Sequence, residues 1–339
     1  MTRSTSRTNS RTNSRMPRHP ARPGFTITEL LIVIGIIILL IGILLPALGK
    51  VNERAKVAET NATMEEFAKA CEAFRQEFGF YPGIVPEEIL AADPQISGTE
   101  NAILHLMGGA IDQNDPEFDQ GPYVTWPQIT FGSGPNTFRI RYNVSEIGKG
   151  PRIAGQSYAP FFSPKSTELA PTTGQVLADG TADDKAIPDL LDAWGQPIMY
   201  LRAARGVGDL VGEYASGARN QFVIEPIYPY LLSDFLGELG QAQADSILRL
   251  NSGSNRAKTL AQLIRHPGFG NESQPNSGGA IGTAKGKIVL MSSGADGIYF
   301  SQYDGPGTEA APQTNIRTGS YAKPGVVGDY DDVAVFTGG

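Results

Sequence analysis

Cysteine and histidine are scarce in this chain of 339 residues. Cys71 is the single cysteine, so no disulfide can form within the chain. The three histidines, His19, His105 and His266, stand far apart, and no cysteine or histidine spacing fits a zinc site. We therefore expect the folded part of the chain to be stabilised by packing or by a metal rather than by disulfides.

The sequence also lacks the short motifs of common enzymes. No Gly-x-Ser-x-Gly nucleophile turn occurs. The run from Gly282 to Lys287 has three residues between its glycines, where a phosphate-binding loop has four, and it lacks the closing serine or threonine. Paired acids such as Asp183 and Asp184 are typical of exposed loops. We assign no catalytic residue and expect that the protein is not an enzyme.

Negative charge is absent from residues 1–24, which are rich in serine, threonine and asparagine and carry six arginines. Such a segment has little to bury, so we expect it to be disordered and to hold the N-terminus in the cytoplasm. The whole chain has 28 basic and 35 acidic residues, and without these arginines 22 basic residues remain against 35, a balance of −13. Surfaces that bind nucleic acid are normally basic, so we expect no nucleic-acid partner.

One long apolar run fills residues 25–48. Leu30 to Leu45 carries no charge, and about 20 helical residues span a bilayer core. Glu29 lies inside the run, where an unpaired acid costs about 2.5–3.5 kcal/mol at the membrane centre. The segment offers it no partner, so we expect the partner on another molecule or at a newly made terminus. A secretory signal peptide and an uncleaved anchor are the alternatives, although no Ala-x-Ala cleavage site follows the run.

The start of this run, Gly-Phe-Thr-Ile-Thr-Glu from Gly24 to Glu29, resembles the processing signal of type IV pilins and type II secretion pseudopilins. That family has a glycine before the cut, a phenylalanine after it and a glutamate at the fifth mature position, which Gly24, Phe25 and Glu29 match. The resemblance implies that a prepilin peptidase removes residues 1–24 and methylates the new Phe25 amine. It also implies that Glu29 docks on the amine of a neighbouring subunit.

Beyond the apolar run, the spacing of apolar residues predicts that the helix continues. They recur at intervals of three and four, with charged residues between them, as in an amphipathic helix. Gly79 is expected to end the helix, and Pro82 prevents its continuation. The helix would thus have a transmembrane half over 25–48 and an amphipathic half over 49–80, with Cys71 buried on the apolar stripe.

The rest of the chain holds most of the 40 glycines and 24 prolines, which predicts a loop-rich head. We interpret residues 81–188 as an irregular insertion with a strand at 137–143, and residues 189–339 as a pseudopilin-like sheet with a C-terminal acidic loop. The expected elements of the latter are strands ending at Arg202 and at 221–224, 287–291 and 333–336, and helices at 230–239 and 257–265. The predicted fold class is α+β, pilin-like: a long N-terminal helix packed on a small antiparallel sheet with long irregular loops.

Residues 192–200 read Asp-Ala-Trp-Gly-Gln-Pro-Ile-Met-Tyr and resemble the Asp-Pro-Trp-Gly-x-Pro-x-x-Tyr segment of major type II secretion pseudopilins. The chain departs from that pattern at Ala193, where the family usually has proline. Taken alone, Trp-Gly-x-Pro is a turn with a hydrophobic anchor. The resemblance implies a structural role as well, because this segment starts the sheet that packs on the long helix.

Another segment, Ser292 to Gly297, resembles the calcium loop of the same pseudopilins. Two adjacent acids, Asp331 and Asp332, lie further along the chain and belong to the same pattern. By this resemblance, the calcium ligands are Asp296, Asp331 and Asp332. Calcium prefers six to eight oxygen ligands, which carboxylates and loop carbonyls supply. Asp304 and Asp329 lie in the same loop and could substitute or assist. The alternative is a solvated acidic turn; the spacing is not that of an EF-hand.

Together, these resemblances imply a type II secretion-like pseudopilin, closest to the major subunit but with a large insertion. Such a protein is a structural subunit of a filament that drives protein export. Its expected place is the bacterial inner membrane, single-pass, with the N-terminus in the cytoplasm and the head in the periplasm. The implied partners are the prepilin peptidase, other pseudopilin subunits and the inner-membrane assembly platform. A type IV pilin or pilus-like adhesion subunit is the alternative; a membrane-tethered periplasmic enzyme or receptor is an alternative of another class.

Overall fold

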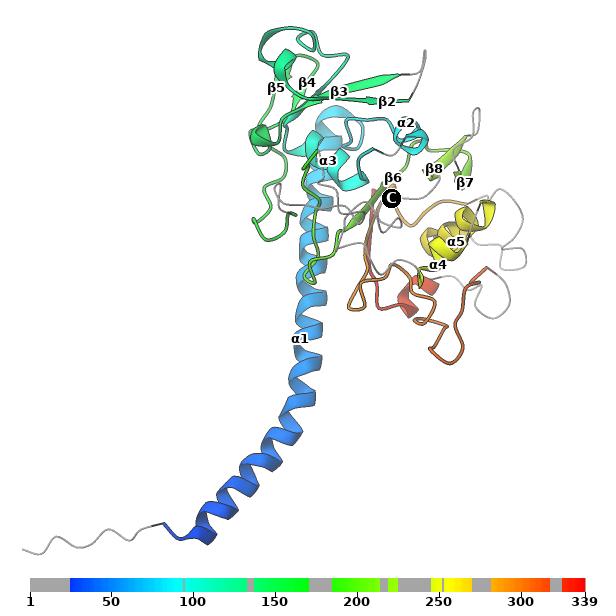
Figure 1. The fold of residues 1–339 in the computed structure, drawn as a ribbon. Coiled ribbons are helices and arrows are strands. Elements are labelled where there is room, and N and C mark those ends of the chain that lie inside the picture. The colour runs from blue at the N-terminus through cyan, green and yellow to red at the C-terminus, as the bar shows by residue number, and fades with distance from the viewer. Residues whose placement is uncertain are drawn as a thin grey trace, which may run out of the picture. The chain divides into compact units, whose positions relative to one another are not determined.

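The protein has an α+β fold, as predicted, in which a 52-residue N-terminal helix packs against small antiparallel sheets (Figure 1). The computed structural model describes residues 25–93, 95–132, 137–170, 185–213, 219–224, 245–251, 253–269, 282–317 and 325–338. The chain divides into two compact units, Met1–Val51 and Asn52–Gly339. Helix α1 (Ile27–Phe78) begins in the first unit and ends in the second.

Between Leu30 and Leu48, the part of α1 in the first unit is apolar on every side. Its large apolar side chains from Leu30 to Leu48 are between 43% and 66% exposed. A helix that is apolar all round is stable only where something apolar surrounds it. This part of α1 is long and apolar enough to cross a membrane, so it is a candidate membrane span or signal sequence.

The part of α1 in the second unit is amphipathic. Met64, Phe67, Cys71 and Phe74 recur at three and four residues and are completely buried, while the charged residues between them stay largely exposed. The helix ends at Phe78. Gly79 follows in the left-handed conformation, at φ +83°, and its amide donates to the carbonyl of Arg75 at 2.7 Å. The predicted glycine cap and the predicted burial of Cys71 are both confirmed.

The buried stripe of α1 packs on a three-stranded antiparallel sheet in the order β10–β9–β6. Its strands are β6 (Met199–Arg202), β9 (Ile288–Ser292) and β10 (Val333–Thr337). Residues alternate between the faces of a strand, and both faces of β9 are buried: Leu290 lies in the core that includes α1, and Met291 in the core that includes α5. The sheet therefore separates two hydrophobic cores.

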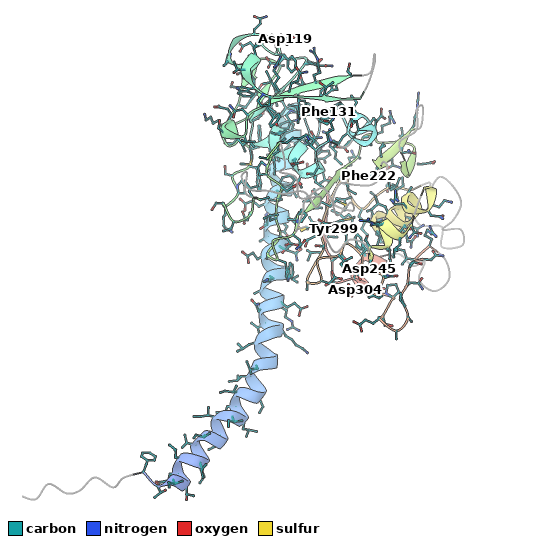
Figure 2. All side chains as sticks on the ribbon, viewed as in Figure 1. Asp119, Phe131, Phe222, Asp245, Tyr299 and Asp304 are labelled. Carbon is teal, nitrogen blue, oxygen red and sulfur yellow. The ribbon has the colours of Figure 1, made fainter. Side chains whose placement is uncertain are left out.

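The second core is built from the elements on the other face of the sheet. Strands β7 (Asp209–Glu213) and β8 (Asn220–Ile224) pair in parallel. The helical elements there are α4 (Ile247–Leu250), α5 (Ser254–Ile264), η6 (Pro267–Phe269) and η8 (Val326–Asp329). Figure 2 labels Phe222 and Tyr299, which are both buried in this core.

A third core, built from described residues between Ile84 and Ile187, surrounds a separate sheet in the order β1–β3–β2. Its strands are β1 (Ala110–Asp112), β2 (Gln128–Phe131) and β3 (Phe138–Tyr142), and a hairpin of β4 (Arg152–Ile153) and β5 (Gln156–Ser157) follows. The helical elements are α2 (Glu87–Ala92), α3 (Gly98–Leu106), η1 (Gly121–Thr125) and η3 (Val144–Glu146). Phe131, labelled in Figure 2, is buried among them.

Most of the expected elements are confirmed. The predicted strands correspond to β3, β6, β8, β9 and β10, and the helix predicted at 257–265 corresponds to α5. The helix predicted at 230–239 lies outside the described residues. Helix α3 was not predicted, although Ser97 and Glu100 show the Ser-x-x-Glu spacing of a capping box, and both hydrogen bonds of that box are present.

Candidate functional site

The turn that leads into β6 is organised by the carboxylate of Asp192. Its Oδ1 accepts hydrogen bonds from the backbone amides of Trp194 at 2.8 Å and Gln196 at 2.9 Å. The amide of Asp192 donates to the carbonyl of Gln196 at 2.8 Å and closes the turn. Gly195 sits at φ +80°, a conformation that other residues rarely adopt. Asp192 therefore shapes the backbone of this turn.

This turn is joined to the loop that follows β9. The hydroxyl of Ser292 donates to Oδ2 of Asp192 at 2.6 Å, and the hydroxyl of Tyr299 donates to the carbonyl of Pro197. Ser292 and Tyr299 are both buried. The two segments that resemble pseudopilin motifs thus form one substructure, although Asp192 and Ser292 stand 100 residues apart.

The same turn is joined to α1. The amide of Ala193 donates to the hydroxyl of Thr60 at 3.1 Å, and Thr60 is completely buried. The ammonium of Lys56 lies 5.8 Å from the centre of the Trp194 ring, a cation–π distance. The turn therefore helps to hold the sheet on the amphipathic part of α1.

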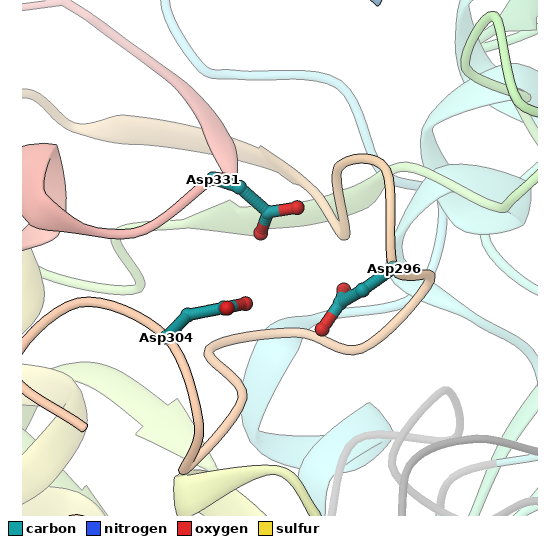
Figure 3. A group of neighbouring side chains, drawn as sticks. All are labelled: Asp296, Asp304 and Asp331. Carbon is teal, nitrogen blue, oxygen red and sulfur yellow. The ribbon is translucent and has the colours of Figure 1, made fainter. Parts of the chain in front are cut away.

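Three carboxylates converge beside this substructure (Figure 3). They belong to Asp296, in the loop after β9, Asp304, in the loop that follows, and Asp331, just before β10. One oxygen of each lies within 4.8 Å of an oxygen of the other two. Such a group could hold a metal ion.

The backbone of the loop after β9 sets this geometry. The amide of Ala295 donates to Oδ2 of Asp331 at 3.1 Å, and the amide of Ile298 donates to Oδ1 of Asp296 at 2.8 Å. Gly294 sits at φ +66°, and a Cβ there would lie 2.7 Å from the carbonyl oxygen of Asp331. Glycine at this position therefore allows the chain before β10 to approach the loop.

The close approach of these acids makes their charged forms costly. Burial, assisted by repulsion from Asp331 and Asp304, raises the pKa of Asp296 to about 7. Burial and repulsion from Asp304 raise the pKa of Asp331 to about 6. Asp296 and Asp331 are exposed as whole residues, but their carboxylates turn inward toward Asp304 (Figure 3). The group therefore favours a compensating positive charge.

Asp332 lies outside this group, in contrast to the ligand set expected from the sequence. Its two oxygens accept from the amide of Phe300 at 2.9 and 3.0 Å. The carboxylate of the neighbouring Asp331 accepts instead from the amide of Ala295, so the two acids face different parts of the loop. Asp304, expected from the sequence only to substitute or assist, completes the group instead, and Asp329 is not part of it.

The donor set fits a hard divalent cation. Its side-chain ligands are all carboxylate oxygens, which calcium and magnesium prefer, and it contains no thiolate or imidazole that would favour zinc. Oδ2 of Asp304 is buried and has no hydrogen-bond partner within the described residues. A buried carboxylate oxygen without a donor is costly, and a cation held by Asp296, Asp304 and Asp331 would satisfy it.

At the N-terminal site, Glu29 has a partner in its own segment, contrary to the expectation from the sequence. Gly24 lies outside the described residues, and Phe25 is 83% exposed. Oε2 of Glu29 accepts from both the amide and the hydroxyl of Thr26 at 2.8 Å, and the amide of Glu29 donates to that hydroxyl at 3.2 Å. Glu29 thus has a partner within its own segment, but that partner is uncharged, so the negative charge of Glu29 is not neutralised.

The order of elements, a long apolar helix followed by antiparallel sheets, is consistent with a pilin-like architecture. The chain matches no protein-family model, no curated protein and no solved structure.

Proposed function

We propose that this protein is a pseudopilin, a structural subunit of a type II secretion-like filament that drives protein export. The observation that carries the proposal is the register at the start of α1. Phe25 and Glu29 stand at the two positions that such a subunit requires, directly at the beginning of a 52-residue helix. The partners would be a prepilin peptidase, further pseudopilin subunits and an inner-membrane assembly platform.

Two properties of α1 support filament assembly. From Leu30 to Leu48 its apolar side chains have no cover within the described residues, so they are available to lipid before assembly and to other helices after it. Glu29 keeps an unneutralised charge at the start of this surface. A charged amine at the N-terminus of a second subunit would neutralise it, and opposite charges attract each other more strongly in an apolar surrounding than in water.

The metal held by the acidic group is proposed to be calcium. Each carboxylate offers two oxygens, and the flexible, high coordination of calcium suits three acids from separate loops better than the strict octahedron of magnesium. Asp296, Asp304 and Asp331 would be its ligands. The ion would stabilise the head, because it would join the loop after β9 to the residue before β10 in a chain without disulfides.

The filament proposal is tested by replacing the docking acid. Glu29→Ala should abolish incorporation of the subunit into filaments and the secretion that depends on them. The matched control is Glu53→Ala, which removes an exposed acid of the same helix in the second unit. Export and incorporation are measured in cells whose own copy of the gene is deleted. Normal incorporation and secretion by the Glu29→Ala subunit would overturn the proposal.

The calcium proposal is tested by thermal unfolding of the full chain in detergent with calcium and with a chelator. We expect a lower melting temperature in the chelator and no such difference in Asp304→Asn. Asp119→Asn, which changes an exposed acid far from the group in the sequence, should keep the wild-type response. Equal melting temperatures for the wild type in calcium and in chelator would leave the three residues as loop acids.

A further inference from the structure

A cavity of about 300 Å³ lies on the part of the protein formed by residues 80–202. Its lining comes from the segment after α1, helix α3, the end of β1 with the loop that follows, the start of β3, the β4–β5 hairpin and the end of β6. This volume is at the lower end of the range for ligand pockets, which suits a ligand of one ring. None of its lining residues belongs to the acidic group or to the N-terminal docking site.

The cavity wall is held in place by one buried carboxylate. Oδ2 of Asp115 accepts from the guanidinium of Arg152 at 3.0 Å and from the amide of Gly155 at 3.1 Å, and Oδ1 accepts from the amide of Glu117 at 2.9 Å. The hairpin turn includes Ala154 at φ +50°, an unusual conformation for a residue other than glycine. These bonds fix the hairpin against the loop after β1, so the cavity exists before any ligand enters.

Polar groups with unused hydrogen-bonding capacity meet in this cavity. Nδ1 of His105 accepts from the amide of Gly83 at 3.1 Å, so the ring proton is on Nε2, which makes no hydrogen bond within the described residues. Oδ1 of Asp112 accepts from the amide of Asn114 at 2.7 Å, and Oδ2 remains as an acceptor. The side-chain amide of Asn114 is exposed and offers both a donor and an acceptor.

Charge within the lining is balanced. Two carboxylates, Asp112 and Asp115, are matched by the two guanidiniums of Arg152 and Arg202. Arg202 is already bound to Glu87 at 2.7 Å and to two backbone carbonyls. Burial, assisted by repulsion from Arg202, lowers the pKa of His105 to about 3, so its ring is neutral at pH 7. Both guanidiniums already have a carboxylate partner, so an anionic ligand would find no free positive charge, whereas Asp112 keeps an oxygen that can accept from the hydroxyls of an uncharged ligand.

An aromatic ring stands at the edge of the cavity. Phe80 is 45% exposed, yet its ring is fixed, 5.5 Å from that of Phe74 and 5.7 Å from that of His105. An exposed phenylalanine held this way offers a flat apolar face beside hydrogen-bonding groups. Sugars combine a face of C–H groups, which packs on aromatic rings, with hydroxyls that both donate and accept.

We propose that this cavity binds one uncharged saccharide ring, stacked on Phe80 and hydrogen-bonded to His105, Asp112 and Asn114. This is a binding activity beyond that of a filament subunit, and it does not depend on assembly. The ring could be a free sugar or the end of a longer glycan.

The test is ligand-observed saturation-transfer NMR on the full chain in a detergent without a sugar headgroup. The probes are glucose, galactose, mannose and N-acetylglucosamine, each as the free sugar and as its methyl glycoside. We expect saturation transfer to the ring protons of at least one of them. If a methyl glycoside binds as well as its free sugar, the natural ligand is the end of a glycan. If only the free sugar binds, the natural ligand is a free sugar.

Three variants distinguish this cavity from any other place on the protein. Asn114→Ala and Phe80→Ala remove exposed groups and should each weaken binding about fivefold to tenfold. Gln120→Ala changes an exposed residue of the same loop that does not line the cavity, and it should bind like the wild type. Absence of transfer to every probe, or equal transfer in all three variants, would overturn the proposal. Tighter binding of glucose 6-phosphate than of glucose would also overturn it.

Discussion

The two parts of α1 differ in whether their apolar side chains are buried by the chain itself. Between Leu30 and Leu48 the large apolar side chains are at least 43% exposed. Between Met64 and Phe74 the large apolar residues and Cys71 form one stripe that is buried on β6 and β9. The second part thus obtains its apolar surroundings from its own chain, whereas the first part must obtain them from lipid or from other molecules. A single helix can therefore stabilise the head at one end and offer an assembly surface at the other.

The largest expected effect comes from removing a ring of the buried stripe. Phe67 is completely buried and meets Phe162 and Tyr200 edge to face, at 5.1 and 5.6 Å. Phe67→Ala should lower the free energy of unfolding of the head by about 3–5 kcal/mol, because it leaves a cavity. Denaturant unfolding followed by the fluorescence of Trp126 and Trp194 measures this.

The matched variant in the first part of α1 is Ile38→Ala. Ile38 is 64% exposed, so its replacement should leave the unfolding of the head unchanged. A loss as large as that of Phe67→Ala would show that residues 27–51 contribute to the stability of the head, and the contrast between the two parts would fail.

A smaller loss is expected at the turn that holds the sheet on α1. Asp192→Ala leaves the amides of Trp194 and Gln196 and the hydroxyl of Ser292 without their acceptor. Buried donors without partners cost about 1–3 kcal/mol each, partly relieved by water. We expect the free energy of unfolding to fall by about 2–3 kcal/mol, measured as for Phe67→Ala. A change below 0.5 kcal/mol, which is about the effect of an ordinary surface substitution, would exclude this role for Asp192.

His105, at the end of the buried stripe, should make the stability of the head depend on pH. His105 packs on Phe74, with ring centres 4.7 Å apart, and burial lowers its pKa to about 3, against about 6.5 in the unfolded chain. Below pH 6.5 the unfolded state binds a proton that the folded state does not, so the head loses about 1.4 kcal/mol for each pH unit down to pH 3.

His105→Gln should remove this contribution. The difference in unfolding free energy between wild type and variant should therefore shrink as the pH falls from 7 to 5. The acids of the head are the same in both proteins, so their titration cancels in this difference. A constant difference over that range would show that His105 has an ordinary pKa.

The smallest effect is expected where α1 meets the Asp192 turn at its surface. Lys56→Ala removes a cation from the face of Trp194, an interaction of about 0.5–1 kcal/mol at an exposed site. Lys56→Arg keeps the cation and should keep the stability. If both variants unfold like the wild type, this contact adds nothing to the attachment of the turn.

The sequence predicted the elements whose patterns are local. The stripe of α1, its end at Gly79 and the strand β9 follow from periodicity and from a glycine cap, and all are confirmed. The fold of residues 81–188 did not follow, because β1 and β2 are short and are stabilised by pairing with β3 rather than by a pattern of their own.

The membership of the acidic group also could not be predicted from a local sequence pattern. Asp296 and Asp331 were identified from sequence, but which of the neighbouring acids joins them depends on the direction of each side chain. Asp332 turns to the amide of Phe300, and Asp304 reaches the group from a loop of its own. The resemblance to the pseudopilin calcium loop implied Asp332, whereas the folded loops bring Asp304 to the group.

The most direct test of the contrast within α1 is photo-crosslinking from Ile38 in cells. A photoreactive phenylalanine analogue at Ile38 should form adducts that contain a second copy of this chain, because this surface is proposed to pack on neighbouring subunits. The same analogue at Val124, an exposed residue of the head, serves as the control and should not form them. Adducts of Ile38 with a second copy, lost in a Glu29→Ala background, are the predicted result. An Ile38 variant that reaches the membrane but forms no such adduct would contradict the account.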